Sequence, residues 1–325
     1  MSQTILLTGA FGSIGSRVLR NLLADGHRLT CLDLKSPGAE AVSRAYADRV
    51  RIVWGDICER AVLEDALRGA GAVIHMAAII PPLANDKPDL ATAINVEATR
   101  TLVELMERSA NAKRLVFASS MGLAGLEQHR REPPLRTDEP PAPNDHYGRT
   151  KASCETLIRA STLQWTLLRI AACPPERGGS EDEIKMIFDF SADGRVEFVH
   201  GDDVARAFSN AVRCDAAIGR LLFVGGGARC QTYAYDFFNS MLGATGLGPL
   251  PRAAFRPGPP YFFGDWLDTD ESQALLRFQQ HTLADLYASQ RQAAGYKRHL
   301  LRLVAPLVNR RLLKHSPYWK QAGGA

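Results

Sequence analysis

The chain has 325 residues, of which 46% are hydrophobic and 23% are charged. This composition is typical of soluble globular proteins and excludes a largely disordered chain. The length suffices for one large domain, or for one domain with a smaller lobe. The formal net charge of +4 is small and its excess lies at one end of the chain, which argues against a nucleic-acid-binding surface and predicts no nucleic-acid partner.

The excess positive charge lies in residues 286–325. This segment has no acidic residue and contains eight basic ones: Arg291, Lys297, Arg298, Arg302, Arg310, Arg311, Lys314 and Lys320. Its apolar side chains recur on one face of a predicted helix: Leu300, Leu303, Val304, Leu307 and Val308. This face either makes weak contact with an anionic membrane surface or docks on the body of the protein or on a partner subunit. Pro306 and the short apolar stripe favour docking.

The six cysteines show no C-x-x-C pair and no zinc-like spacing, so we expect free thiols in a reducing compartment and no metal site. Residues 1–4 run directly into a predicted strand and leave no room for a signal peptide. No apolar run reaches the length of a membrane span, since Arg302 interrupts the best candidate. These features together predict a cytoplasmic protein.

The chain begins with a predicted strand over residues 4–8, a glycine-rich turn, and a helix over residues 17–24. The glycines permit a tight turn and let backbone amides approach a pyrophosphate at the helix N-terminus. The strand–turn–helix context favours this interpretation over a glycine loop without a ligand. We therefore predict cofactor contacts from the turn: Gly9, Phe11, Gly12, Ser13, Ile14 and Gly15.

The second predicted strand, residues 28–32, ends in Asp33. A carboxylate at this position accepts hydrogen bonds from the adenosine ribose and repels a 2′-phosphate, which favours NAD over NADP. Lys35 follows closely and weakens that preference. NAD is therefore the predicted cofactor, with NADP the less favoured alternative.

Two further strands add predicted cofactor contacts. The strand over residues 51–55 is followed by Asp56 and Ile57, which we expect to contact the adenine. The fourth strand and its turn cover residues 72–78, where the small side chains of Ala77 and Ala78 would admit the cofactor. His75, within that strand, is interpreted as structural rather than catalytic.

The next segments contain candidate polar residues. The proline-containing loop 79–88 is either a rigid edge of a substrate pocket or a connector. A long helix is predicted over residues 89–109, where Asn95 either holds a water on a lysine or caps a helix kink. The fifth strand, residues 114–118, ends at Ser119 and Ser120, and a hydroxyl at that end of a doubly wound sheet lies in the ligand crevice.

Tyr147 and Lys151 form a Tyr-x-x-x-Lys unit at the head of a predicted helix that extends to about residue 160. Their i, i+4 spacing places the phenol and the ammonium on one helical face. A nearby cation lowers the pKa of a tyrosine and so suits it for proton transfer to or from a carbonyl or carbinol oxygen. The alternative is a tyrosine packed against the sheet beside a solvated lysine, and the motif alone does not decide between the two.

The segments TGAFGSIG, HMAA, FASS and YGRTK, together with Asp33, Asp56-Ile57 and the Asn95 helix, occur in one order and spacing. In this combination residues 4–225 resemble the short-chain dehydrogenase/reductase superfamily, in its extended branch of NAD-dependent epimerase/dehydratase-like proteins. The resemblance implies that Tyr147 is the acid/base and that Lys151 tunes its pKa and binds the ribose. It also implies that Ser120, or Ser119 if the register shifts by one, donates to the carbonyl oxygen and that Asn95 holds a water. A homodimer through the helices over residues 89–109 and 145–160 is implied in the same way.

The predicted fold is α/β, a Rossmann-type doubly wound parallel sheet with a small C-terminal substrate lobe. Later strands are expected over residues 164–169, 196–200 and 221–224, with Asp203 as a helix N-terminal cap and helices over residues 233–242 and from about 271. The predicted domains are a dinucleotide-binding domain of residues 1–170 to which 196–225 return, a lobe of residues 171–195 and 226–285, and the basic tail 286–325.

The sequence departs from nucleotide-sugar members of the resembled family in the predicted lobe. The Arg-Pro-x-Asn-like segment is absent after Arg169, and the stretch before Asp203 is short and shows no evident pyrophosphate clamp. The helix expected over residues 184–190 is apolar, which favours core over pocket. Met121 and Leu123, just past Ser120, add to an apolar interpretation of the pocket.

Three functional hypotheses follow. The first is an NAD(P)-dependent dehydrogenase or reductase that acts on an alcohol or carbonyl of a relatively apolar small molecule. The second is an epimerase or dehydratase of a sugar or nucleotide sugar, with transient oxidation by bound NAD. The third is a dinucleotide-binding protein without catalysis, which the combination of Tyr147, Lys151 and Ser120 argues against.

Overall fold

The computed structural model describes residues 3–173, 186–260 and 264–323. Its main element is a parallel sheet of seven strands in the order β3-β2-β1-β4-β5-β6-β8. The strands are β1 (Thr4–Thr8), β2 (Arg28–Asp33), β3 (Arg51–Trp54), β4 (Ala72–His75), β5 (Arg114–Ser120), β6 (Gln164–Ile170) and β8 (Arg220–Val224). The order reverses direction between β1 and β4, and this reversal is the ligand crevice of a doubly wound sheet. The predicted Rossmann-type fold is confirmed.

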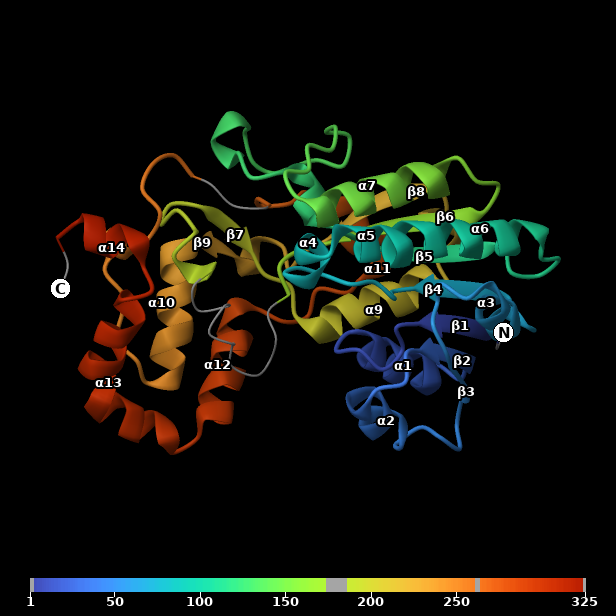
Figure 1. Cartoon of the computed structure of the whole chain (residues 1–325), viewed down its shortest axis with the longest axis horizontal. Coiled ribbons are helices and arrows are strands. Elements are labelled where there is room, and N and C mark those ends of the chain that lie inside the picture. Colours follow the sequence, from blue (N-terminus) through green and yellow to red (C-terminus); the bar gives the residue numbers. More distant parts are fainter. Residues whose placement is uncertain (1–2, 174–185, 261–263, 324–325) are drawn as a thin grey trace.

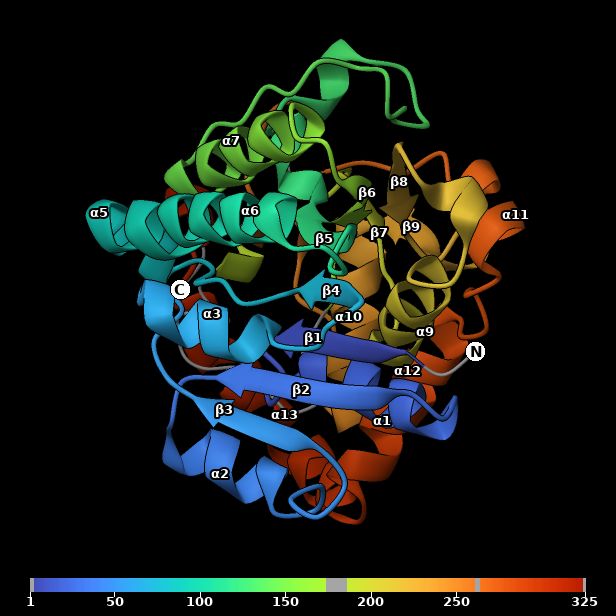
Figure 2. The same ribbon diagram turned by 90° about the vertical axis from the view of Figure 1, so that its right-hand side faces the viewer.

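Helices cover both faces of the sheet (Figures 1 and 2). One face carries α1 (Gly15–Ala24), α2 (Pro37–Ser43), α9 (Gly201–Ala211) and α11 (Asp270–Leu276). The other carries α3 (Arg60–Leu67), α6 (Ala98–Arg108) and α7 (His146–Arg159), with the short helices α4 (Leu83–Asp86) and α5 (Pro88–Ala91) at one end. The strands are apolar on both faces because both are covered: in β1, Ile5 and Leu7 face the core under α1, whereas Leu6 faces the core under α3.

A smaller lobe lies beside the carboxyl ends of the strands (Figure 1). Its two-stranded antiparallel sheet pairs β7 (Arg195–Glu197) with β9 (Gln231–Tyr233). Its helices are α10 (Ala234–Thr245), α12 (Leu283–Ala294), α13 (Lys297–Leu313) and α14 (Pro317–Gln321). The strand expected over residues 196–200 therefore pairs within the lobe, while α11 packs on β8 and α9. The exact domain limits stay a prediction.

The apolar helix expected over residues 184–190 is described in part, and that part lies in the smaller lobe. Its first two residues lie outside the described residues, Met186 and Ile187 are helical, and a turn follows. Phe188 is fully buried and Phe190 is 5% exposed. Phe188 also lines an apolar cavity beside α13, and Met186 is 42% exposed. The expectation that these side chains belong to the core rather than to a pocket is therefore confirmed only for Phe190.

The basic C-terminal segment folds as predicted into helices, but its apolar face does not dock on the rest of the chain. Leu300, Leu303, Val304 and Leu307 are 58%, 80%, 42% and 71% exposed. Only Val308 of the predicted face packs against the lobe, beside Leu312. Docking of this face on the body of the protein is therefore wrong for the four exposed residues.

No helix within the described residues is long and apolar enough to cross a membrane. The cytoplasmic location stays a prediction. The thiols of Cys31, Cys154 and Cys230 are buried and form no disulfide.

Candidate active site

The glycine-rich turn lies at the point where β1 and β4 diverge. Gly9 adopts a φ of +68°, and a Cβ at this position would lie 2.9 Å from the backbone nitrogen of Ala77. A Cβ at Gly15 would collide with the Gly9 carbonyl. Both positions therefore require glycine, and the turn leaves the backbone of residues 13 and 14 at the N-terminus of α1, where a pyrophosphate binds in this class of fold.

Asp33 lies at the carboxyl end of β2 and is tied to the glycine-rich turn. Its Oδ2 accepts a hydrogen bond from the backbone N–H of Phe11 at 2.7 Å, and its Oδ1 accepts one from Leu34 at 2.8 Å. Burial raises the pKa of Asp33 above its ordinary value, and the two hydrogen bonds oppose that rise. Each carboxylate oxygen retains a lone pair for a ribose hydroxyl. Lys35 pairs with Glu40 at 3.5 Å on the exposed surface.

The other predicted cofactor residues occupy different environments. Ala77 lies against Gly9, and its backbone N–H donates to Thr8 Oγ1 at 3.1 Å. Ala78 is partly buried in the next position. Asp56 is exposed and accepts a hydrogen bond from the Cys58 backbone at 2.9 Å. Ile57 is 8% exposed and belongs to the core under α3, so most of its side chain is engaged in packing.

Tyr147 lies in the first turn of α7, next to Ser120 at the end of β5. Asp145 caps the helix by accepting from the backbone N–H of Gly148 at 2.8 Å. Burial raises the pKa of the Tyr147 phenol to about 12, and the neighbouring Ser120 side chain opposes that rise. The expected lowering of the tyrosine pKa by the protein alone is therefore wrong. The phenol is neutral at physiological pH.

Lys151 is buried, with 3% of its surface exposed. Its Nζ donates to the Ala118 carbonyl at 2.8 Å and lies 4.7 Å from the centre of the Phe117 ring and 5.9 Å from that of Tyr147. Burial lowers the pKa of Lys151. The alternative of a solvated lysine is wrong, because the Lys151 ammonium is buried at the carboxyl end of β5, beside the Tyr147 phenol.

Ser119 and Ser120 have separate partners. Ser119 Oγ donates to Glu155 Oε1 at 2.6 Å, and Glu155 forms a bidentate ion pair with Arg169 at 2.7 and 2.9 Å. All three side chains are buried. Ser120 Oγ instead accepts from the Gly122 backbone at 3.1 Å and meets Tyr147. The structure therefore brings Ser120, rather than Ser119, to the phenol.

Asn95 lies in a π-helical turn, Thr92–Glu97, that interrupts the long helix predicted over residues 89–109. Its amide accepts from the Ile79 backbone N–H at 2.9 Å and donates to the Ile79 carbonyl at 3.0 Å and to Thr150 at 3.2 Å. The Asn95 carbonyl accepts from Thr99 and Cys154. Asn95 thus fixes the loop after β4 to the helix that carries Tyr147, and its water-holding role stays a prediction.

His75 is structural, as expected from the sequence. It is 1% exposed, and burial lowers its pKa to about 3, so the ring is neutral. Thr99 gives its hydroxyl proton to the Asn95 carbonyl at 2.6 Å. His75 Nε2 therefore donates to Thr99 at 2.9 Å and Nδ1 accepts from Thr8 at 2.7 Å. The ring links the glycine-rich turn to the π-helical turn.

The sequence did not predict two groups of residues that support the site. Asn85, in α4, accepts from the Tyr147 backbone at 3.1 Å and donates to Asp145 at 3.1 Å, so it fixes the head of α7. Glu155 and Arg169 form a buried ion pair beneath Ser119. Such contacts depend on how distant segments meet, and a local motif does not encode them.

Met121 and Leu123, which were expected to make the pocket apolar, are 4% and 0% exposed. A Cβ at Gly264 would collide with Met121. Their contribution to a substrate pocket stays a prediction.

Asp203 is not a helix cap. His200 caps α9, while Asp203 is buried and accepts from the backbone of Gln280 and from His281. The sequence interpretation of Asp203 is wrong because its carboxylate binds a segment far away in the chain.

His200, Asp202 and His281 bring one potential metal-ligating atom each within 4.8 Å of one another. Two of these residues already bind other side chains. Arg17 and Arg20 each form an ion pair with Asp202 at 2.6 Å, and His281 donates a hydrogen bond to Asp203 at 2.7 Å. The two imidazoles stack with their centres 3.9 Å apart, so their lone pairs do not converge. We assign no metal to this cluster.

A doubly wound sheet, a glycine-rich turn at its switch point, and Ser120 near Tyr147 and Lys151 of α7 form the arrangement that the sequence resemblance predicts. Residues 5–225 match the family described as the NAD dependent epimerase/dehydratase family. The chain belongs to that family.

Curated relatives carry several activities. A D-erythronate dehydrogenase of Cupriavidus necator is 32% identical over 168 residues, covering 48% of this chain and 49% of that protein. A dTDP-glucose 4,6-dehydratase of Streptomyces griseus is 32% identical over 254 residues, covering 70% and 75%. The chain thus spans about half the length of the D-erythronate dehydrogenase and three quarters of the dehydratase.

Solved structures show the same fold. A UDP-glucuronic acid 4-epimerase from Bacillus cereus, in complex with UDP-glucuronic acid and NAD, has a TM-score of 0.75 at 20% identity, over 90% of this chain and 99% of that one. A short-chain dehydrogenase/reductase superfamily protein from Agrobacterium tumefaciens with bound NAD has a TM-score of 0.73 at 21% identity, over 94% and 99%.

Proposed function

We propose that this protein is an NAD-dependent dehydrogenase or reductase that acts on an alcohol or carbonyl group of a relatively apolar small molecule. The observation that carries this proposal is the position of the Tyr147 phenol beside the buried Lys151 ammonium, whose Nζ lies 5.9 Å from the centre of the phenol ring, with Ser120 close enough to lower the phenol pKa. Two hydroxyls that meet at a substrate oxygen, with a cation behind them, suit proton transfer coupled to hydride transfer.

The residues at the switch point fit NAD. Gly9 and Gly15 make the tight turn sterically possible, which leaves the N-terminus of α1 for a pyrophosphate. Asp33 offers carboxylate oxygens to the ribose hydroxyls. The same carboxylate repels the 2′-phosphate of NADP, and Lys35 is paired with Glu40. When bound, the nicotinamide accepts or supplies hydride and, in its oxidised form, adds a positive charge.

The remaining chemistry belongs to the protein. Tyr147 Oη gives its proton to the substrate oxygen during reduction and is left as the phenolate, and this phenolate form takes the proton of the alcohol during oxidation. Ser120 Oγ donates to the same oxygen and orients it. Lys151 favours the phenolate form of Tyr147 by its charge and lies under the phenol, where a ribose hydroxyl would meet it.

The substrate class follows from exposed apolar side chains near Tyr147. Ile80 and Leu83 are 61% and 42% exposed on the segment between Ile79 and Asn85, which Asn95 and Asn85 tie to the helix of Tyr147. Because burying such side chains against a ligand is favourable, we propose that this segment forms the apolar wall of the substrate site.

The second candidate is an epimerase or dehydratase of a sugar or nucleotide sugar that oxidises its substrate transiently with retained NAD. The relative that favours it is the dTDP-glucose 4,6-dehydratase of Streptomyces griseus, matched over 70% of this chain. Catalysis of this kind uses the same three side chains, so geometry at Tyr147 does not separate the two.

Native and denaturing mass spectrometry of the purified protein tests the choice. A dehydrogenase exchanges its cofactor at every turnover. We therefore expect that dialysis removes any bound NAD and that the dialysed protein binds added NAD reversibly. NAD that survives dialysis in stoichiometric amount would contradict the first candidate and support the second. Failure to bind NAD under any condition would contradict both.

We also propose a homodimer through α6 and α7, as implied by the family resemblance. Light scattering of the purified chain tests it. A dimer mass is expected, and a monomer mass at the same concentration would overturn this assembly without affecting the proposed chemistry.

A further inference from the structure

The outer face of α13 carries a stripe of exposed apolar side chains. Leu300, Leu303 and Leu307 are separated by three and four positions and therefore share one face, with exposed fractions of 58%, 80% and 71%. Tyr296, one turn before Leu300, is 74% exposed. A contiguous exposed patch of this kind marks an interaction site. We define the outer stripe as Tyr296, Leu300, Leu303 and Leu307.

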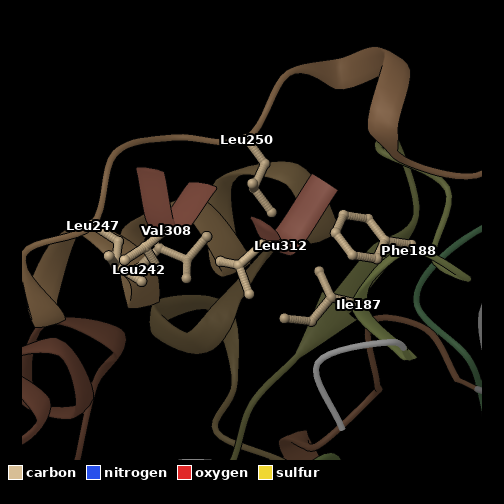
Figure 3. Close-up of a pocket in the computed structure, with 7 residues that line it drawn as sticks. All are labelled: Ile187, Phe188, Leu242, Leu247, Leu250, Val308 and Leu312. Carbon is tan, nitrogen blue, oxygen red and sulfur yellow. The ribbon is translucent and has the colours of Figure 1, made fainter. Parts of the chain in front are cut away.

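The side of α13 that adjoins the outer stripe, beginning at Val308, is also apolar and packs on the lobe. Val308 and Leu312 line an apolar cavity of about 190 Å³ together with residues of α10 and neighbouring segments (Figure 3). Asn309 donates to the Gly248 carbonyl at 2.9 Å and anchors the same face. A surface helix that packs one face on the protein normally presents polar residues outward. Along residues 296–307 the exposed side of α13 carries large apolar side chains instead, and this is the surface that a partner would cover.

Charge identifies the kind of partner. Basic residues flank the outer stripe: Lys297 and Arg302 are exposed along it, and Arg310, Arg311 and Lys314 are exposed at its C-terminal end. Residues 286–325 contain no acidic residue. The helix thus combines leucines with cations along about 25 Å, which is the pattern of a helix lying in the interface of an anionic membrane.

Other partners fit this surface less well. A second copy of α13 would cover the outer stripe but would bring two uniformly basic helices together, and the like charges would repel within the Debye length. A nucleic acid would neutralise the cations but leave the leucines in water. An anionic lipid surface satisfies both groups at once.

We propose that α13 is a membrane-docking helix that lies on an anionic lipid surface with its outer stripe inserted among the acyl chains and its basic residues at the headgroups. This binds the folded enzyme to the surface without spanning the membrane. The proposal is independent of the catalytic chemistry.

Vesicle co-sedimentation of the full-length protein tests the proposal. We expect binding to vesicles of phosphatidylcholine mixed with phosphatidylglycerol, much weaker binding to phosphatidylcholine alone, and loss of binding as salt increases. Leu303→Gln with Leu307→Gln should lower the partition coefficient by about a hundredfold. Arg310→Gln with Arg311→Gln should lower it about 25-fold, at about fivefold per cation.

Two matched controls accompany these variants. Arg44→Gln with Arg49→Gln removes the same charge from exposed positions of the larger domain, and Leu90→Gln replaces a leucine that is 41% exposed on α5. Both should bind vesicles as the wild type does. Because every substituted residue of the outer stripe is exposed, circular dichroism should show an unchanged fold.

Three outcomes would overturn the proposal: no wild-type binding to the anionic vesicles, equal loss of binding in the controls, or a dimer that only the Leu303/Leu307 variant dissociates. The last would assign the outer stripe to self-association. None of these readouts requires cofactor or substrate, so failure here is distinguishable from failure of the proposed enzymatic function.

Discussion

Ser119 and Ser120 are neighbours at the end of β5, yet their hydroxyls serve different functions. Ser119 donates to Glu155 at 2.6 Å within a buried ion pair, whereas Ser120 meets the Tyr147 phenol. The cause is the alternation of a strand, which directs successive side chains to opposite faces of the sheet. A shift of one position along the strand therefore separates the serine proposed to bind the substrate from the serine that stabilises the buried ion pair.

Substitution of each serine should separate the two roles. Ser120→Ala should lower turnover about a hundredfold, because it removes the hydroxyl that orients the substrate oxygen. It should lower the free energy of unfolding by about 1 kcal/mol or less, because it also removes the acceptor of the Gly122 backbone N–H. Ser119→Ala should lower the free energy of unfolding by about 1–3 kcal/mol, because it removes a buried hydrogen bond to a carboxylate. Urea unfolding and steady-state kinetics on the two variants measure both effects. The reverse pattern would transfer the catalytic role to Ser119.

Tyr147→Phe should keep cofactor affinity and lower turnover by about 100- to 10,000-fold, since it removes only the hydroxyl that transfers the proton. Calorimetric titration with NAD and steady-state kinetics check the two parts. Tyr46→Phe, on the larger domain away from this hydroxyl pair, is the control and should behave as the wild type. Full activity of Tyr147→Phe would remove the proposed mechanism.

Tyr147 should titrate above the ordinary tyrosine range in the protein alone, because burial raises its pKa to about 12. In a pH titration, the tyrosinate absorbance of the wild type minus that of Tyr147→Phe should therefore show a transition at a pH above the ordinary tyrosine range. Oxidised NAD brings a positive charge toward the phenol and should shift this transition to lower pH. The base form drives alcohol oxidation, so its rate should rise with pH, while carbonyl reduction should fall as the proton is lost. An unmoved transition on NAD addition would place the nicotinamide away from Tyr147.

Asp33→Ala should weaken NAD binding about tenfold to a hundredfold, because it removes charged hydrogen bonds to the ribose, and should weaken NADP binding less because it also removes a repulsion. Calorimetric titration with both cofactors gives the ratio of affinities. Asp48→Ala, an exposed carboxylate of the same domain, should leave the ratio unchanged. An unchanged ratio in Asp33→Ala would refute the role given to this carboxylate.

The sequence predicted the elements whose signal is local. Continuous apolar runs such as residues 4–8 and 114–118 marked strands buried on both faces, and a glycine-rich turn between strand and helix marked the crevice. The basic tail was correctly predicted as helical. The Tyr-x-x-x-Lys spacing placed two side chains on one helical face, and the structure adds that Lys151 is buried.

The sequence did not reveal features that depend on which distant segments meet. Asn85 accepts a hydrogen bond from the backbone of Tyr147 across the fold, and Met121 is buried. The tyrosine pKa was expected to fall because Lys151 is close in sequence. It rises instead, because burial, which depends on the whole fold, is the largest cause of the shift.

The sequence by itself determined the class of fold, the crevice and the pairing of phenol with ammonium, because periodicity and spacing act within one element. Only the tertiary structure decided that Ser120 rather than Ser119 meets Tyr147, that Asn95 ties the loop after β4 to α7, and that the leucines of α13 face outward. Those outcomes depend on burial and on hydrogen bonds between segments far apart in the chain, which exist only once the segments have packed.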